Sequence, residues 1–327
     1  MLLAGDLGAT KTLLGLFDLV DGRPVATTTR RYPTQTFASA PALLNQFWHD
    51  IGARHALSAA AFGVAGPVMA DTARLTNVAW STSVSELREA CQGVPISLIN
   101  DVAAIAYGVP ALDAADLVVL QTGERVAGAP ISILSVGTGL GAATAAWCDG
   151  RTVVLPSETG HADFAPCSDR DFEVAQALRR IHGRCAIEHV VSGSGLVAMA
   201  GVLHGNVRCA AVGDGTATDL PAATARAAAQ GACVHCVATL DVFVRALGSE
   251  AGNVALRTLP YGGLYLAGGV SAKLRDWLTD GRWLEAFLAK PPMEGVLRRV
   301  PVAVITNEDA GLLGAAVAAA ASVTGAR

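Results

Sequence analysis

Short apolar runs separated by polar turns dominate the first third of the chain. They predict strands over Leu2–Asp6 and Thr12–Asp18, joined by a tight turn, and a third strand over Val25–Tyr32. A continuous apolar run predicts a buried strand over Ala59–Ala65, and a shorter run predicts another over Ile96–Ile99.

Helical spacing of apolar residues separates these strands. A helix is predicted over Pro41–Arg54, and Pro41 suits its first turn because the missing N–H costs nothing there. A second helix is predicted over Val84–Cys91, with Ser83 available as its N-cap. The order of strands and helices is typical of one compact α/β domain.

A second cluster of strands and a long helical region fill the rest of the chain. We place the boundary at a hinge near Gly108. Residues 1–108, completed by the terminal helix at about 306–327, then form a small α/β domain, and residues 109–305 form a large α/β domain with a helical insertion. The elements predicted in the large domain are strands over Leu117–Leu120, Ile131–Val136, Ala142–Trp147, Leu264–Ala267 and Val302–Ile305, with helices over most of Asp169–Arg257.

The composition agrees with a folded protein of two domains. The chain has 327 residues, of which 52% are hydrophobic and 16% charged, and this excludes a disordered chain. The longest apolar stretch, Ala310–Val323, is shorter than the roughly 20 residues that a membrane-spanning helix needs. The first residues include no basic segment, so we expect no secretory signal and a cytoplasmic protein.

The charge and the cysteine content bear on three properties: nucleic-acid binding, disulfide formation and zinc binding. The chain has 24 basic and 28 acidic residues and no basic stripe, so nucleic acid is not expected as a partner. The seven cysteines are scattered and read as reduced thiols. Cys233 and Cys236 form the one tight pair, with His235 close by. Because a zinc site needs about four ligands, this pair is interpreted as ordinary helix packing without zinc.

The turn between the first two strands has the composition of a phosphate-binding loop. Its glycines let backbone N–H groups approach phosphate oxygens, Thr10 and Lys11 add donors and charge, and Asp6 can hold Mg²⁺ through water. The alternatives are a plain hairpin turn and a Walker A loop, but the latter requires a glycine before the lysine. The turn reads Gly5-Asp6-Leu7-Gly8-Ala9-Thr10-Lys11.

Two further glycine turns follow strands of the second half. The run from Gly137 through Thr138 and Gly139 to Gly141 has more glycines than a hairpin needs, and it indicates a second turn facing phosphate. Gly268 and Gly269 end another strand, where glycine permits the close approach of a flat ligand such as adenine; simple loop closure is the alternative.

Polar residues suited to hydroxyl chemistry occupy three other places. Asn100 and Asp101 end an apolar strand, where α/β sheets bind ligands, although a helix cap would also explain them. Glu158 and His161 can converge on one ligand, the alternative being a structural histidine. Glu188, ahead of a Ser-Gly-Ser-Gly run, is uninformative by itself.

Taken in order along nearly the whole chain, these motifs resemble those of the bacterial ATP-dependent glucokinases outside the repressor/kinase branch. The most specific run is Leu-Pro-x-Glu-x-Gly-His-x-Asp-Phe-Ala-Pro over residues 155–166. The other matches are Asn77 with Trp80, Ser192-Gly193-x-Gly195-Leu196 and Gly311-Leu312-Leu313-Gly314.

The resemblance implies a two-domain actin/hexokinase-like (ribonuclease H-like) α/β fold, with ATP and sugar meeting in an interdomain cleft. It implies transfer of the γ-phosphoryl group of ATP to the 6-hydroxyl of glucose, with Mg²⁺ and with Asp101 as general base. A homodimer is also expected. By the same resemblance, Asn100, Glu158, His161 and Glu188 hold sugar hydroxyls, while the Gly5–Lys11 turn, Gly137–Gly139 and Gly268-Gly269 surround the nucleotide.

The phosphate turn departs from the family pattern. The family has Gly-Gly-Thr-Asn there with an arginine two residues after the Asn, whereas this chain has Lys11 in place of the Asn and Leu13 in place of the arginine. Lys11 is the obvious substitute for the missing charge. The zinc-binding cysteine cluster of the related repressor/kinase group does not follow His161.

Three other functions are alternatives to the glucokinase activity that the resemblance implies. A kinase for another hexose, such as mannose or glucosamine, would use the same motifs. A non-catalytic sugar sensor would need a DNA-binding helix pair, which we do not expect because the sequence opens in the first strand. A dehydrogenase is suggested by the G-x-G-x-x-A match beginning at Gly193, but this run lies in a helical region and reads as a helix start.

Overall fold

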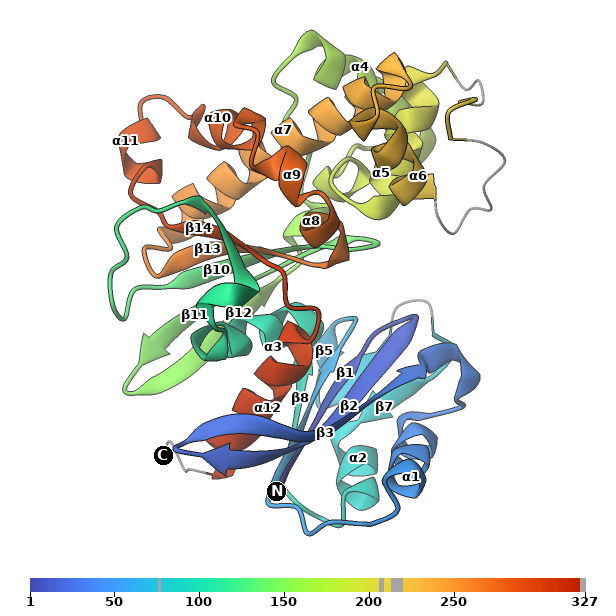
Figure 1. Cartoon of the computed structure of the whole chain (residues 1–327), viewed down its shortest axis with the longest axis vertical. Coiled ribbons are helices and arrows are strands. Elements are labelled where there is room, and N and C mark those ends of the chain that lie inside the picture. Colours follow the sequence, from blue (N-terminus) through green and yellow to red (C-terminus); the bar gives the residue numbers. More distant parts are fainter. Residues whose placement is uncertain (76–77, 206–208, 213–219, 324–327) are drawn as a thin grey trace. The chain divides into compact units, whose positions relative to one another are not determined.

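The computed structural model describes residues 1–327 apart from 76–77, 206–208, 213–219 and 324–327. Two compact units form the chain (Figure 1). The first comprises Met1–Asp116, Ala143–Pro156 and Asn307–Arg327, and the second comprises Leu117–Ala142 and Ser157–Thr306.

A five-stranded sheet is the centre of the first unit. Its order is β3-β2-β1-β4-β8, with the first three strands antiparallel and the last three parallel. A separate small sheet joins β5, β6 and β7. The strands are β1 (Leu2–Leu7), β2 (Lys11–Val20), β3 (Arg23–Pro33), β4 (Ala59–Val64), β5 (Val68–Met69), β6 (Thr72–Arg74), β7 (Ser81–Ser83) and β8 (Ile96–Asn100).

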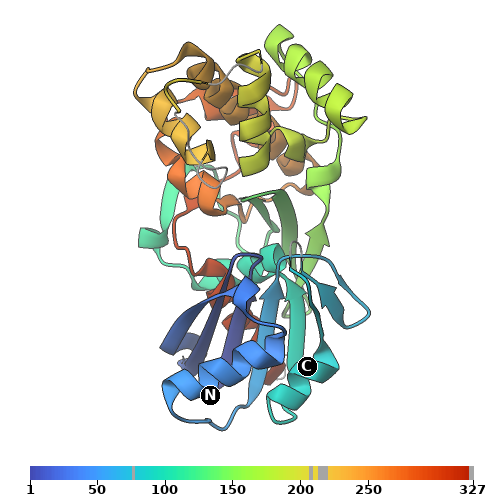
Figure 2. The same cartoon turned by 90° about the vertical axis from the view of Figure 1, so that its right-hand side faces the viewer.

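Helices cover both faces of this sheet, which explains its almost continuous apolar strands. On β1, Leu3 packs with the core beneath α1 (Ala40–Ile51) and α2 (Val84–Ala90), whereas Leu2 and Ala4 pack with the core beneath α12 (Ala310–Val323). The alternation follows from the two-residue period of a strand. Figure 2 shows α1 lying across one face of the sheet.

The helices α12 and α3 (Asp101–Gly108) cross with their backbones almost in contact. A Cβ atom added at Gly314 would overlap the carbonyl oxygen of Ala104, and one added at Gly108 would lie 2.9 Å from the carbonyl oxygen of Ala310. The crossing therefore requires glycine, which explains Gly314 in physical terms.

A six-stranded sheet of order β12-β11-β10-β13-β14-β9 carries the second glycine turns. Its central strands β10, β13 and β14 are parallel, and β9 is antiparallel to β14. The strands are β9 (Leu117–Gln121), β10 (Ile131–Val136), β11 (Leu140–Cys148), β12 (Arg151–Ser157), β13 (Gly263–Ala267) and β14 (Val302–Ile305).

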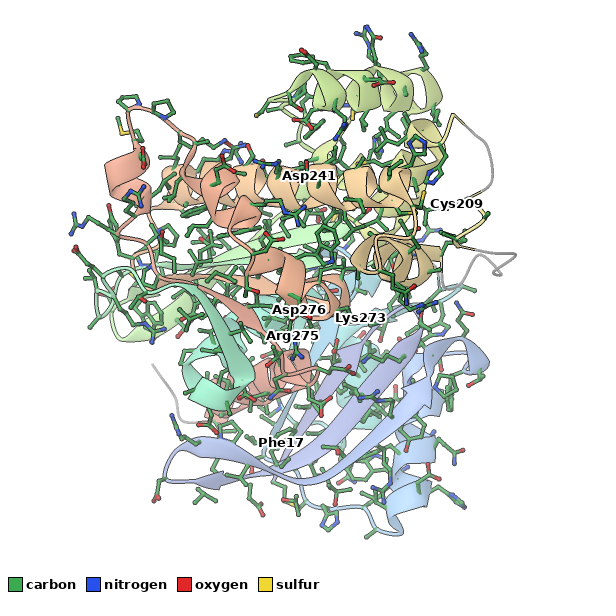
Figure 3. All side chains as sticks on the ribbon, turned by 45° about the horizontal axis from the view of Figure 1, so that its top comes forward. Phe17, Cys209, Asp241, Lys273, Arg275 and Asp276 are labelled. Carbon is green, nitrogen blue, oxygen red and sulfur yellow. The ribbon has the colours of Figure 1, made fainter. Side chains whose placement is uncertain are left out.

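The second unit packs its helices around the long helix α7 (Val234–Thr258). Trp283 and Phe287 stack at 5.1 Å and are fully buried where α10 (Arg282–Leu288) crosses α7. At the same crossing Asp241 on α7, which is labelled in Figure 3, accepts a hydrogen bond from Arg282 at 3.3 Å. The other helices are α4 (Asp169–His182), α5 (Gly193–Leu203), α6 (Leu220–Ala229), α8 (Gly269–Lys273), α9 (Arg275–Leu278) and α11 (Glu294–Leu297). The 3₁₀ helices of the chain are η1 (Thr34–Thr36), η2 (Val109–Ala111), η3 (Ala114–Asp116), η4 (Thr159–His161) and η5 (Ile187–His189).

The structure confirms the strands and long helices predicted from periodicity, with small shifts at their ends. The first helix begins at Ala40 because Ser39 caps it, so Pro41 still lies in the first turn. The small sheet β5–β7, the strand β12 and the short helices α8–α11 were not predicted, since runs of two to seven residues carry too little periodic signal.

The hydropathy of the described helices agrees with the expectation that the longest apolar stretch is too short to span a membrane. None of them alone is both long and apolar enough to cross a membrane, and α6 with α7 meets the criterion only as a pair bent by 106°.

Candidate active site

Parallel strands bring two aspartates to one edge of the first sheet. Asp6 on β1 lies in register with Gly63 on β4, and Gly63 lies in register with Ile99 on β8, just before Asn100 and Asp101. A Cβ atom added at Gly63 would lie 3.7 Å from the Cα atom of Asp101, so Asp101 lies against the residue that pairs with Asp6.

The start of α3 holds Asp101 in a defined position. The side-chain oxygen of Asn100 accepts hydrogen bonds from the backbone N–H groups of Val102 at 3.0 Å and Ala103 at 3.2 Å, so Asn100 is the N-cap. Asp101 is the first helical residue, and its Oδ1 accepts from the N–H of Val102 at 2.9 Å. The amide of Asn100 also donates to the carbonyl oxygen of Gly66 at 3.3 Å.

The pKa of Asp6 is shifted well above its ordinary value. Burial is the main cause that raises its pKa to about 7, and Asp101 and then Asp309 add to the shift, while Lys11 opposes it. Its carboxylate lies against the first turn of α12, where a Cβ atom added at Gly311 would lie 2.9 Å from Oδ2. The glycine at 311 therefore leaves room for Asp6.

The first glycine turn is a hairpin turn that hydrogen bonds hold in place. The N–H of Gly8 donates to the carbonyl oxygen of Lys11 at 3.1 Å, and the hydroxyl of Thr34 donates to the carbonyl oxygen of Gly8 at 2.7 Å. Gly5 and Leu7 are buried in the core; a Cβ atom at Gly5 would approach Phe62 to 2.5 Å. Within this turn the exposed residues are Thr10 and Lys11.

A cluster of charged side chains stands beside this turn. Lys11 pairs with Glu308 at 3.4 Å, and Arg31 reaches Glu308 at 3.8 Å and Asp309 at 3.6 Å. Arg31 lies in register with Leu13, the residue that replaces the family's arginine. Sequence reasoning missed Arg31 because only strand pairing brings it next to Leu13.

The second set of glycines lies at the edge of the larger sheet. Ser135 on β10 pairs in register with Ala267 on β13, so the turn after β10 and the Gly268-Gly269 pair emerge side by side. Gly268 has φ +87°, and a Cβ atom there would overlap Val136. Added Cβ atoms at Gly137 and Gly269 would meet nothing within 4 Å among the described residues, so these glycines border open space.

The first turn of α5 holds the Gly137–Gly139 turn in place. The N–H of Gly193 donates to the carbonyl oxygen of Gly137 at 2.9 Å, and the hydroxyl of Ser194 donates to the carbonyl oxygen of Thr138 at 2.9 Å. Ser192 caps α5 by accepting from the N–H of Gly195 at 2.9 Å. The G-x-G-x-x-A match is thus a helix start, as predicted.

Glu188 on η5 connects this turn with His161 on η4. One carboxylate oxygen accepts from the N–H of Leu140 at 3.0 Å, and the other lies 3.9 Å from Nδ1 of His161. A Cβ atom added at Gly139 would overlap the Glu188 carboxylate, and one added at Gly160 would overlap the carbonyl oxygen of Leu140. Both glycines therefore allow the close packing that sets Glu188 beside His161.

The remaining predicted site residue of this unit is Glu158, which is exposed and forms the N-cap of η4. Its carbonyl oxygen accepts from the N–H of His161 at 3.0 Å. Glu188 had no signal of its own in the sequence, and only the resemblance pointed to it. Asn77 lies outside the described residues.

Comparison with known proteins places these motifs in one family. A family model described as Glucokinase matches residues 3–322. A glucokinase from Nostoc sp. is 37% identical over 338 aligned residues, which cover 98% of this chain and 99% of that protein.

Solved structures give the same result for the fold. The crystal structure of a glucokinase from an Antarctic psychrotroph matches with a TM-score of 0.83 at 32% identity, covering 97% of this chain and 98% of that one. A ROK family glucokinase from Streptomyces griseus, solved in complex with glucose and AMPPNP, matches with a TM-score of 0.64 at 22% identity over 97% of this chain and 98% of that one. The predicted actin/hexokinase-like α/β fold is confirmed.

Proposed function

The chain belongs to the glucokinase family, and from that premise we propose that it transfers the γ-phosphoryl group of ATP to the 6-hydroxyl of glucose with Asp101 as general base. The observation that carries the assignment of Asp101 is its place at the end of β8. There Asn100 caps the helix, and the N–H of Val102 donates to the carboxylate of Asp101 at 2.9 Å. ATP as phosphate donor is supported by the relative solved with glucose and AMPPNP.

Asp101 supplies the proton transfer of the reaction. It orients the 6-hydroxyl of glucose and accepts its proton while the hydroxyl oxygen attacks the γ-phosphorus and ADP leaves. Phosphoryl transfer depends mainly on positioning and charge neutralisation, so a base fixed at a helix start suits it.

Glucose is held, in this proposal, by Glu158, His161, Glu188 and Asn100. Each ring hydroxyl can both donate and accept, and carboxylates, imidazole and an amide supply complementary partners. The contact of Glu188 with Leu140 supports this role, because it fixes the carboxylate at 3.9 Å from His161. A wrong epimer would leave buried polar groups unpaired.

We assign nucleotide binding to the three glycine turns, Gly5–Lys11, Gly137–Gly139 and Gly268-Gly269. Open space beside Gly137 and Gly269 supports the approach of a phosphate chain or an adenine ring. In the other unit, Lys11 and Arg31 provide the positive charge that the family takes from an arginine at position 13.

The oxygen donors beside this turn fit Mg²⁺, because Asp6 and Asp101 are neighbouring carboxylates whose repulsion a divalent cation would offset. We propose that Asp6 holds the ion through water. When bound, the ion neutralises phosphate charge.

The raised pKa of Asp6 predicts a pH-dependent stability. In the unfolded chain this carboxyl ionises near its ordinary pKa of 3.8, whereas in the fold it keeps its proton until about pH 7. The folded state therefore binds more protons between these values, and the free energy of unfolding falls as pH rises from about 4 to about 7. Denaturant unfolding without Mg²⁺ at several pH values measures this slope.

Asp6→Asn should remove that slope and make the protein more stable than wild type at pH 8, while its activity falls. Asp113→Asn, an exposed change in the same unit, should keep the wild-type slope. Equal slopes in wild type and Asp6→Asn would show that the Asp6 carboxyl does not titrate in this range.

Lys11→Ala should raise KM for MgATP more than KM for glucose. We expect a change of about two- to fivefold, because Lys11 is largely exposed and a single exposed charge contributes little. The double variant Lys11→Ala/Arg31→Ala should give a larger change, since Arg31 lies beside the same acidic residues. Arg23→Ala, at the opposite end of the β2–β3 pairing, is the control. Unchanged MgATP kinetics with weakened glucose kinetics would contradict the assignment.

A coupled assay with ATP and a panel of hexoses tests the proposed function. Glucose should give the highest kcat/KM, with mannose and glucosamine as the competing substrates. A protein that binds glucose without turning it over would instead be a sugar sensor. The cytoplasmic location and the homodimer expected above stay predictions.

A further inference from the structure

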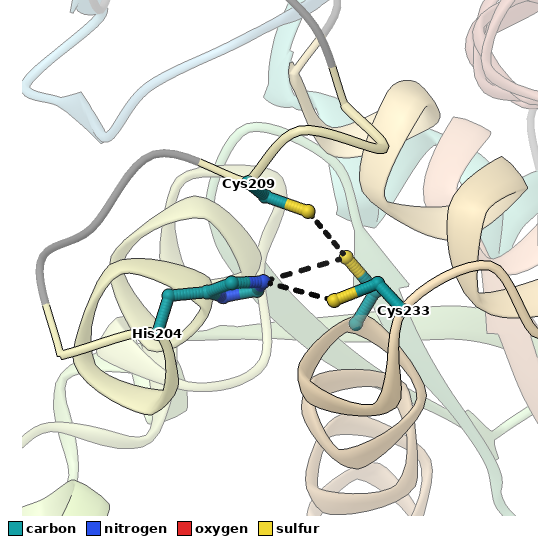
Figure 4. Close-up of side chains that lie close together, drawn as sticks. His204, Cys209 and Cys233 are labelled. Atoms are coloured by element: carbon teal, nitrogen blue, oxygen red, sulfur yellow. Dashed lines mark hydrogen bonds between the residues drawn. The ribbon is translucent and has the colours of Figure 1, made fainter.

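Four metal-binding side chains converge in the helical part of the second unit. His204 caps the end of α5, Cys209 follows it in the chain, Cys233 is the N-cap of α7, and Cys236 lies in the first turn of α7. Their ligand atoms all lie within 4.8 Å of one another, and Figure 4 shows His204, Cys209 and Cys233 pointing to a common centre.

Three of the distances among these atoms match a tetrahedral zinc site. With Zn–S of about 2.3 Å and Zn–N of about 2.0–2.1 Å, tetrahedral geometry separates two sulfurs by about 3.8 Å and a sulfur from a nitrogen by about 3.6 Å. Here the sulfurs of Cys209 and Cys236 lie 3.6 Å apart, and Nε2 of His204 lies 3.3 Å from Cys233 and 3.8 Å from Cys236.

The histidine is held in the tautomer that a metal needs. Nδ1 of His204 lies 2.6 Å from the carbonyl oxygen of Ala200, so this nitrogen carries the hydrogen and donates it. Nε2 then presents its lone pair to the thiols. A backbone carbonyl bound to the second ring nitrogen is the usual outer support of a zinc-binding histidine.

The distance between the sulfurs of Cys209 and Cys236 does not fit a disulfide. An S–S bond is about 2.05 Å long, much shorter than the 3.6 Å between Cys209 and Cys236, and all the cysteines are free. A thiolate is the form that binds metal.

We propose that His204, Cys209, Cys233 and Cys236 bind one Zn²⁺ ion in a closed Cys₃His site that fastens the end of α5 to the start of α7. Three sulfurs and one imidazole favour zinc over Mg²⁺ or Ca²⁺, which prefer oxygen ligands. Because four protein ligands fill a tetrahedral shell, the site is structural and leaves no position for a substrate. The expectation of ordinary packing without zinc considered only His235 beside Cys233 and Cys236, whereas His204 and Cys209 lie close to the same thiols.

The first experiment measures zinc in the intact protein. Protein purified without chelators and dialysed against metal-free buffer should retain about one zinc ion per chain by elemental mass spectrometry. Adding Zn²⁺ alone to chelator-treated protein should restore that ratio and raise the unfolding temperature. Cobalt substitution should produce the thiolate-to-metal charge-transfer band and the visible bands of tetrahedral Co²⁺.

Two histidine variants provide a matched comparison. His204→Ala should weaken zinc affinity by more than the roughly 10–100-fold that loss of an outer partner causes. His235→Ala removes the exposed histidine between the two cysteines of α7, whose ring lies 5.0 Å from that of His204, and it should keep zinc. Cys148→Ser, an exposed cysteine elsewhere, should also keep it.

The zinc proposal can be tested even if a variant fails to fold, because the zinc measurements on the wild-type protein do not depend on the variants. Wild-type protein that neither retains zinc nor takes it up stoichiometrically overturns the proposal. So does a Cys209–Cys236 disulfide found by mass spectrometry in freshly purified protein, or a His204→Ala variant that folds and binds zinc like wild type.

Discussion

Asp101→Asn is expected to lower kcat by about 10²–10⁴-fold, the usual contribution of a general base. The amide has nearly the shape of the carboxylate, and its oxygen can still accept the hydrogen bond from the N–H of Val102. The fold and glucose affinity should therefore stay close to wild type. Steady-state kinetics and glucose-binding calorimetry on the same preparation measure both quantities.

A second measurement distinguishes loss of the base from structural damage. Asp101 raises the pKa of Asp6 by repulsion, so the neutral amide should lower that pKa and reduce the decline in stability between pH 4 and 7. Asp113→Asn should change neither kcat nor the pH dependence, because this side chain is exposed on a loop. Near-normal turnover by Asp101→Asn would show that another group accepts the proton.

The strands of the sheets, and the glycines and polar residues at their ends, could be predicted because their signal is local. Apolar runs such as Ala59–Val64 and Ile131–Val136 have few polar residues within them, and glycines or polar residues mark their ends. The identity of the helix cap was less predictable. Asn100 and Asp101 are both good N-caps, and only the direction of the chain after β8 gives the cap to Asn100.

The parts that could not be predicted depend on residues distant in sequence. Arg31 reaches the acidic residues beside Lys11 because β2 and β3 pair in one particular register. His204 and Cys209 come from the segment before α6, and the fold of the helical region brings them to Cys233 and Cys236. A window along the sequence detects a Cys-x-x-Cys pair, but it cannot detect ligands 27 to 32 residues away.

Glucose affinity should fall about 5–150-fold in each of three variants, Glu158→Gln, His161→Ala and Glu188→Gln. In each case one sugar hydroxyl loses its partner, and a buried unsatisfied group costs about 1–3 kcal/mol. Glu188→Gln keeps an oxygen that can accept from Leu140, so the Gly137–Gly139 turn should stay in place while the charge beside His161 is lost. Calorimetry with glucose alone measures the effect, and Glu173→Gln, an exposed change on α4, is the control.

The double variant His161→Ala/Glu188→Gln tests whether these residues act on one ligand. Because the two side chains lie 3.9 Å apart, their effects on glucose binding should not add, whereas effects at independent sites add within about 0.3–0.5 kcal/mol. ATP affinity measured without sugar should barely change in any of these variants, since none removes a glycine of the nucleotide turns. If instead the variants bind glucose like wild type and lose ATP, then Glu188 and His161 serve the nucleotide, and the sugar must be held by other residues.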